Sequence, residues 1–195
     1  LKWERVLEIL AYQSRQMGIA YDSAASKDHI EPFINSFYLR ESLRDLVEPD
    51  PTKYATFNQF FAREIKPSAR PIANPDDPNV VSSPADCRLM VFPTVDLATR
   101  YWIKGYGFTL GKLLQGDVLA CQFDGGSITI ARLAPQDYHR WHSPVDGTVL
   151  FIKEIPGTYY TVNPQAITQA GALDVFCENR RSVMFIRRKP PHRPI

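Results

Sequence analysis

The sequence predicts an α+β fold, in which N-terminal helices are followed by a mostly antiparallel β core that is incomplete at the C-terminus. Apolar residues recur at helical spacing before residue 66, whereas short strand-like segments and proline-rich connections follow Pro67. A chain of 195 residues can bury roughly 70% of the surface that its unfolded state exposes. We therefore expect a helical region over residues 1–66 and a β-rich core over 67–195, packed as one unit.

The first predicted helix covers residues 1–17. Its apolar side chains fall on one face, at Trp3, Val6, Leu7, Leu10 and Met17. Its polar face carries both signs of charge, at Lys2, Glu4, Arg5 and Glu8, whereas helices that lie in a membrane surface usually carry a basic polar face. Packing against the protein core is therefore favoured over a membrane-surface helix.

Two further helices are predicted before Pro67. From Ile30 the apolar residues again follow helical spacing, and Pro32 fits the first turn, where its missing N–H group costs little. Thr56 followed by Gln59 has the pattern of a capping box at the start of a short helix. That helix would bring three aromatic rings together, those of Phe57, Phe60 and Phe61.

The strand predictions rest on brief segments rich in β-branched and aromatic residues and bounded by Gly, Pro or Asp. They cover Arg88–Phe92, Tyr101–Lys104, Ser127–Leu133, Thr148–Ile155, Thr158–Val162 and Ser182–Arg187. Pro156-Gly157 predicts a hairpin turn between two of them, because Pro presets one turn torsion and Gly tolerates positive φ. Residues 110–114 predict one helical turn within this half.

Composition excludes several classes of protein. Lys and Arg number 23 and Asp and Glu 21, which gives a net charge of +2, so nucleic acid is not expected as a partner. The three cysteines, Cys87, Cys121 and Cys177, are odd in number and far apart, which favours a reducing compartment over a disulfide framework. No uninterrupted apolar run reaches the roughly 20 residues of a membrane-spanning helix.

The densest group of chemically versatile residues is the segment 137–144, which holds His139 and His142. Pro144 and the preceding strand make this segment a loop, and no third ligand follows, so a zinc site is disfavoured. The residues alone leave two interpretations open. The two imidazoles are either hydrogen-bonded loop residues or acid–base groups, and the latter would need an orienting partner such as Asp86 in the turn Ser83–Asp86.

Taken together, these segments resemble the phosphatidylserine decarboxylases, specifically their eukaryotic extra-mitochondrial type. Residues 57–71 (FNQFFAREIKPSARP) and 83–86 (SPAD) resemble two motifs of the family. Residues 133–144 (LAPQDYHRWHSP) and 157–164 (GTYYTVNP) resemble two more, in the same order. Residues 21–26 and 30–34 are similar to the helical leader of the eukaryotic extra-mitochondrial type.

The resemblance implies a self-processing proenzyme that carries a pyruvoyl group in place of pyridoxal phosphate. By motif position, Asp86 would orient His142, and His142 would take the proton from a serine near the C-terminus. That serine would attack the preceding Gly carbonyl, and the chain would separate into β and α parts. His139 would transfer a proton during decarboxylation, and the pyruvoyl group would be the electron sink as CO₂ leaves.

One departure from the family pattern limits what this sequence is expected to do. The serine that becomes the pyruvoyl group is not found, because Gly125-Gly126-Ser127 precedes the histidine segment and is better explained as a turn that opens a strand. We expect a truncated β-subunit region that is inactive alone and has the C-terminal α part of the same proenzyme as its partner. No residue of this sequence is assigned to bind a cofactor or a metal.

The expected substrate is phosphatidylserine, which would become phosphatidylethanolamine and CO₂. Contact with the membrane would be peripheral and the location intracellular, with the endomembrane system favoured over the mitochondrial inner membrane. Two alternatives stay open. One is a pyruvoyl-type decarboxylase of a soluble aromatic amino acid, and the other is a non-catalytic fragment that binds anionic lipid through Arg132, Arg140 or Lys104.

Overall fold

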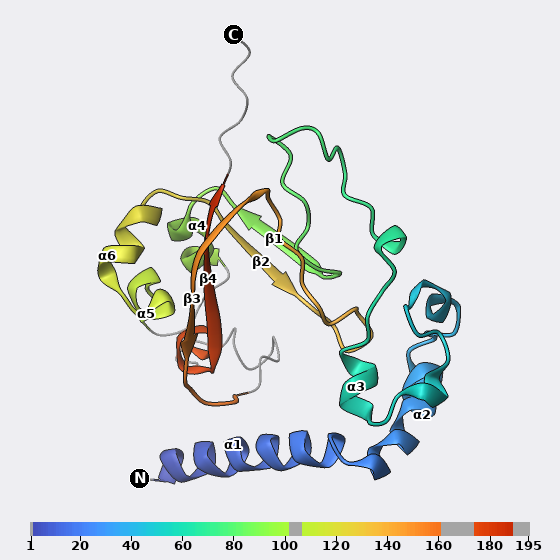
Figure 1. Ribbon diagram of the computed structural model, residues 1–195. Helices are drawn as coiled ribbons and strands as arrows, with labels where there is room; N and C mark the ends of the chain where they lie inside the picture. Colours follow the sequence, from blue (N-terminus) through green and yellow to red (C-terminus); the bar gives the residue numbers. More distant parts are fainter. Residues whose placement is uncertain (1, 102–106, 161–173, 189–195) are drawn as a thin grey trace. The chain divides into compact units, whose positions relative to one another are not determined.

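The computed structural model describes residues 2–101, 107–160 and 174–188. It combines N-terminal helices with two two-stranded antiparallel sheets, which confirms the predicted α+β class (Figure 1). The chain divides into two compact units, each assembled from separate stretches of sequence. The first unit contains Leu1–Arg15, Leu89–Ile130 and Val149–Ile186, and the second contains Gln16–Arg88, Ala131–Thr148 and Arg187–Ile195.

The second unit has an aromatic and aliphatic core supplied by its helices. These include the end of α1 (Lys2–Tyr21), α2 (Ile30–Ser36) and α3 (Phe57–Phe61), with short 3₁₀ turns between and after them at Ala24–His29, Glu41–Asp45, Pro51–Lys53 and Pro67–Ala69. The buried cluster consists of Ile30, Ile34, Leu39, Leu46, Tyr54, Phe57 and Phe60. Phe60 and Ile34 are completely buried. This core supports the loops that carry the candidate site.

The start of α3 is fixed by the cap that the sequence predicts. The Thr56 hydroxyl accepts a hydrogen bond from the Gln59 N–H at 3.1 Å, and the Gln59 side chain accepts one from the Ala55 N–H at 2.6 Å. The Thr56 hydroxyl therefore satisfies a backbone donor that a helix start leaves unpaired, whereas the Gln59 side chain accepts from the residue before the N-cap, one position earlier than in a capping box. The helix holds Phe57 and Phe60 in the core, as expected.

Both sheets belong mainly to the first unit. In one sheet β1 (Arg88–Phe92) pairs with β2 (Ile128–Arg132), and in the other β3 (Gly147–Ile155) pairs with β4 (Arg181–Arg188). Figure 1 shows each pair side by side. Four of the six predicted strands are thus confirmed, and each of their ends agrees with the prediction to within one residue.

The hairpin predicted at Pro156-Gly157 is wrong. After β3 the chain makes a single parallel bridge from Thr158 to Asn179, and β3 pairs with β4 instead. Gly157 serves a close backbone approach, because a Cβ atom built on it would lie 2.4 Å from the Glu178 carbonyl oxygen. The rest of the strand expected after Gly157 forms no strand through residue 160, and residues 161–162 lie outside the described part.

The β-rich half contains more helix than the sequence predicted. The helical turn at α5 (Leu110–Leu114) is confirmed, but α4, α6 and α8 were not expected; they span Val95–Tyr101, Asp117–Ala120 and Val175–Glu178. Tyr101, expected to open a strand, ends α4, and residues 102–104 lie outside the described range. The missed signal for α4 is Thr94, whose hydroxyl accepts a hydrogen bond from the Leu97 N–H at 3.3 Å.

The predicted apolar face of α1 is exposed at its C-terminal end. Met17, a member of the predicted apolar face, is 58% exposed, whereas Ala11 is buried. The side chains of residues 3, 6, 7 and 10 lie outside the described part. Of the helices that the structure describes, none combines the length and the apolar character needed to cross a bilayer.

Candidate active site

Asp86 and His142 belong to two proline-containing loops of the second unit. Two backbone hydrogen bonds join these loops, one from the Ser82 N–H to the Pro144 carbonyl at 3.0 Å and one from the His142 N–H to the Pro84 carbonyl at 2.7 Å. Proline has no N–H group, so each proline contributes only its carbonyl to this pairing. The pairing places the backbone of His142 beside the turn that ends at Asp86.

The two loops share a local structure as well as a sequence pattern. Both contain Ser-Pro-x-Asp, at 83–86 and at 143–146. The Ser83 hydroxyl donates to the Ala85 carbonyl and the Ser143 hydroxyl donates to the Val145 carbonyl, each at 2.8 Å. Such bonds from a serine hydroxyl to the backbone two residues later stabilise tight turns. Each turn therefore holds its shape from local contacts.

Asp86 and His142 both line one pocket of about 1050 Å³. The Asp86 carboxylate is bound by the guanidinium of Arg70, which also lines the pocket. The Arg70 Nε lies 2.8 Å from Oδ1 and 3.1 Å from Oδ2, and its Nη2 lies 2.6 Å from Oδ2. Among the described side chains, the hydrogen bonds of this carboxylate go to Arg70 and none to His142. The carboxylate raises the pKa of Arg70, chiefly through these hydrogen bonds.

Sequence reasoning missed Arg70, although it lies within the segment 57–71 that carries part of the family resemblance. A single arginine in a proline-rich connection belongs to no sequence pattern that would predict which carboxylate it binds. The contact with Asp86 spans 16 residues of chain, and only the fold brings the two side chains together.

The imidazole of His142 is supported by an aromatic ring. Its centroid lies 5.5 Å from that of Tyr138, and the two planes are 28° apart, so the rings are stacked. Tyr138 is buried and lines the same pocket, and burial raises the pKa of its hydroxyl. The stacking limits the orientation of the imidazole while leaving its edge open.

His139 occupies a different environment from His142. It does not line the pocket; its ring lies against Phe61 of α3, with centroids 3.9 Å apart. Its Nδ1 is 2.8 Å from the Asp137 carbonyl oxygen. Burial lowers the pKa of His139, because it penalises the imidazolium, and the Asp137 carbonyl opposes this only in part. In the neutral ring Nδ1 carries the proton, since a carbonyl only accepts, and Nε2 keeps its lone pair.

Two arginines hold the histidine loop against the helical part of the same unit. Arg63, only 5% exposed, donates from Nη2 to the carbonyls of Gln136 at 2.9 Å and Asp137 at 3.2 Å. Arg140 donates from Nε to the Ala62 carbonyl at 2.9 Å. Both contacts connect the segment after α3 with the loop, so the helical core positions the two histidines.

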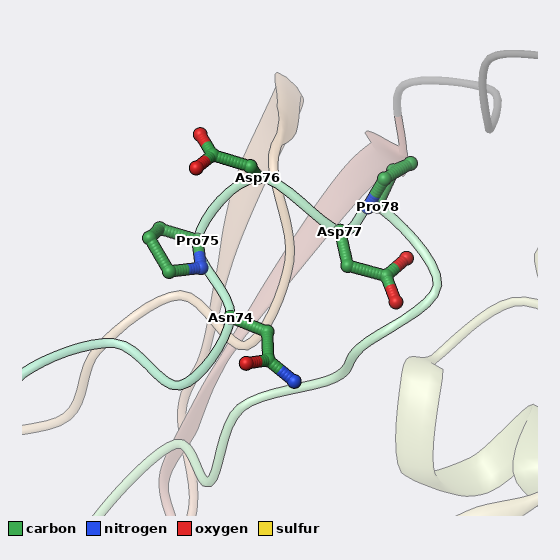
Figure 2. Close-up of a pocket in the computed structure, with 5 residues that line it drawn as sticks. All are labelled: Asn74, Pro75, Asp76, Asp77 and Pro78. Carbon is green, nitrogen blue, oxygen red and sulfur yellow. The ribbon is translucent and has the colours of Figure 1, made fainter.

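A second hollow, of about 500 Å³, is formed by the loop from Asn74 to Pro78. Figure 2 shows that the carboxylates of Asp76 and Asp77 point to different sides of this loop and do not converge. Asn74 adopts a positive φ of 45°, and its carbonyl accepts from the Asp77 N–H at 3.0 Å, as in a tight turn. Over the described residues, no three His, Cys, Asp or Glu side chains are grouped to hold a metal ion.

Comparison with known proteins relates this chain to one enzyme family. The family model for phosphatidylserine decarboxylase matches residues 57–192, a range that includes Asp86, His139 and His142. The chain is 46% identical over 186 residues to phosphatidylserine decarboxylase proenzyme 3 of Schizosaccharomyces pombe, covering 95% of this chain and 19% of that protein.

Two further relatives come from a plant and a bacterium. The chain is 42% identical to phosphatidylserine decarboxylase proenzyme 2 of Oryza sativa subsp. japonica, with 93% of this chain and 29% of that protein covered. It is 40% identical to the phosphatidylserine decarboxylase proenzyme of Clostridium perfringens strain ATCC 13124, with 86% and 55% covered. The chain thus spans between about a fifth and just over half of the length of these relatives.

Proposed function

Because the chain belongs to the phosphatidylserine decarboxylase family, we propose that it supplies the acid–base residues with which a decarboxylase proenzyme processes itself. The observation that carries this proposal is that Asp86 and His142 line one pocket, on two loops whose backbones are hydrogen-bonded to each other. An aspartate beside an imidazole can orient it and stabilise its protonated form, as in serine hydrolases.

The proposed processing step begins at His142. Its imidazole removes the proton from a serine hydroxyl in another part of the proenzyme, and the serine oxygen attacks the carbonyl carbon of the preceding glycine. The peptide C–N bond breaks, the nitrogen takes up the proton, and an ester replaces the amide. Removal of the serine Cα proton then breaks the Cβ–O bond, so the glycine leaves as a free carboxylate and a dehydroalanine starts the second chain part. Water converts this dehydroalanine to a carbonyl group, with release of ammonia. Asp86 has the role of holding the imidazole in the tautomer that accepts this proton.

The residues around the pocket are compatible with a pyruvoyl group and a bound head group in the processed enzyme. The pocket contains an imidazole stacked on a buried tyrosine, and its volume of about 1050 Å³ leaves room for a head group. A pyruvoyl group, when present, supplies an electron sink for decarboxylation. His139 lies outside this pocket, so a proton exchange through its Nε2, which its Asp137 contact leaves with a lone pair, would take place beyond the residues that line it.

The substrate and location follow from the family and are part of the proposal. The mature enzyme would convert phosphatidylserine to phosphatidylethanolamine and CO₂ at the surface of an endomembrane, with peripheral contact. The C-terminal part of the proenzyme would be its partner. Of the arginines considered for lipid binding, Arg140 is engaged by the Ala62 carbonyl and lies 3.8 Å from Glu64, which leaves it less suited to an anionic head group.

A chimeric proenzyme tests this proposal. The chain replaces the 186 matching residues of the Schizosaccharomyces pombe relative, and self-cleavage is followed by electrophoresis and mass spectrometry. CO₂ release is then measured with phosphatidylserine vesicles and, separately, with tryptophan. We expect cleavage, a carbonyl group at the new N-terminus, and CO₂ from phosphatidylserine alone. Release from tryptophan would favour the soluble amino-acid alternative, and vesicle binding without cleavage would favour the lipid-binding alternative.

A further inference from the structure

We propose that Arg70 is a positioning residue for self-processing, which holds the Asp86 carboxylate so that one of its oxygens stays free for His142. This inference rests on the proposed function, because it assigns a partner to the acid of that site. Arg70, Asp86 and His142 all line the same pocket.

The Arg70 guanidinium contacts both oxygens of the Asp86 carboxylate. Nε is shared between Oδ1 and Oδ2, at 2.8 and 3.1 Å, and Nη2 bonds Oδ2 at 2.6 Å. A planar donor that contacts both oxygens fixes the rotation of the carboxylate as well as its position, and bonds between charged partners are short and strong. Lysine, a point charge without this fork, could hold the position but not the rotation.

Arg70 is itself held by its surroundings. Its Nη1 donates to the Ala69 carbonyl at 2.7 Å and lies 3.9 Å from the Asp45 carboxylate. The backbone around it is tied down as well, because the Lys66 N–H donates to the Asp45 carbonyl at 2.8 Å. These contacts hold Arg70 in place, and Arg70 in turn holds the Asp86 carboxylate in place.

The distribution of the bonds leaves one acceptor position open. A carboxylate oxygen has two lone pairs. Oδ2 receives both Nη2 and the longer Nε contact, whereas Oδ1 receives one bond only. Oδ1 is therefore the oxygen that can accept from the His142 imidazole. The backbone bond from His142 to Pro84 already keeps that residue beside the Asp86 turn.

Because this ion pair is partly exposed, it should contribute little to the stability of the fold, and its role in positioning can be tested separately. The side chains of Arg70 and Asp86 are 46% and 29% exposed, and ion pairs at this level of exposure usually contribute little to stability. Loss of Arg70 should thus affect the rate of processing far more than the melting temperature.

The opposite role for Arg70 makes the opposite prediction. If Arg70 competed with His142 for the carboxylate, it would act as a latch, and its removal would accelerate processing. The open lone pair on Oδ1 favours positioning over competition.

The test uses the chimeric proenzyme with Arg70→Met, Arg70→Lys, Asp86→Asn and, as the matched control, Arg44→Met. The Arg44 side chain is 82% exposed and lies in the same unit, 4.0 Å from Asp45. Self-cleavage rates and melting temperatures are measured for each variant. We expect Arg70→Met to cleave up to about 100-fold more slowly, Arg70→Lys to recover part of the rate, and Arg44→Met to match the unsubstituted chimera.

Chemical rescue adds a readout that a merely structural role would not change. Methylguanidinium added to Arg70→Met should restore part of its cleavage rate and should have no effect on Asp86→Asn. Cleavage of Arg70→Met at or above the unsubstituted rate, with Asp86→Asn slow, would overturn the role of Arg70 alone. Cleavage of Asp86→Asn at the unsubstituted rate would instead overturn the proposed function. If Arg70→Met does not fold, full activity in Arg70→Lys contradicts the need for the guanidinium fork.

Discussion

His139 shows how one side chain acquires a defined proton position from its neighbours. Its ring is half-buried against Phe61, and its Nδ1 contacts the Asp137 carbonyl at 2.8 Å. Burial lowers the pKa of the imidazole, so the neutral form dominates at neutral pH. A neutral ring with the proton on Nδ1 presents Nε2 as a base.

The lowered pKa of His139 predicts a dependence of stability on pH. Between the folded-state pKa and the unfolded value of about 6.5, the unfolded chain binds more protons than the folded chain, so stability rises with pH. The contribution is therefore complete above about pH 6.5 and is lost as the pH falls through the lower folded-state pKa. Urea unfolding at a series of pH values should show this loss.

The control for this prediction is His139→Asn, whose amide can still donate to the Asp137 carbonyl but does not titrate. Its unfolding free energy should decrease less on acidification than that of the unsubstituted chain. A titration of the His139 ring by NMR with a midpoint at or above 6.5 would contradict the account.

At the scale of elements, local patterns predicted what depends on neighbouring residues. The cap at Thr56 and the turn at α5 depend on contacts within a few positions, and four strands were recognisable from their local composition although their pairing is long-range; the structure contains all of them. The hairpin at Pro156-Gly157 failed because β3 finds its partner in β4, beyond residue 180. A proline and a glycine indicate where a chain bends. Which strand then pairs with β3 depends on long-range contacts of the sheet.

Gly157 provides a test of this corrected interpretation. A Cβ atom here would lie 2.4 Å from the Glu178 carbonyl oxygen and 2.6 Å from the Arg180 amide nitrogen, both backbone atoms that cannot rotate away. We expect Gly157→Ala to lower the unfolding free energy by about 1–3 kcal/mol, the usual cost of forcing extra volume into a packed site.

Gly18 supplies the comparison, because it lies in α1 and a Cβ atom there meets no atom within 4 Å. Gly18→Ala should leave stability unchanged or raise it by up to about 1 kcal/mol, since alanine favours helices. Urea unfolding of the two variants measures the difference. Equal effects would show that Gly157 is a simple turn residue, as the sequence first suggested.

At the scale of the whole molecule, the candidate site depends on one unit that combines distant parts of the sequence. Arg63 and Ala62, next to α3, contact the histidine loop more than 70 residues later. Sequence motifs named Asp86, His139 and His142 through family resemblance, but they did not show that Arg70 binds Asp86 or that Phe61 covers His139. Those contacts depend on how segments far apart in sequence pack together, which local patterns do not encode.

Asp86 and His142 are proposed to act as a pair, and a double-mutant cycle of self-cleavage rates tests this directly. The chimeric proenzyme is compared with Asp86→Asn, His142→Gln and the two substitutions combined. Residues that act as one unit have strongly non-additive effects. We predict that the double variant is no slower than His142→Gln alone. A double variant slowed by the product of the two single effects would show that the residues act independently and would contradict the account.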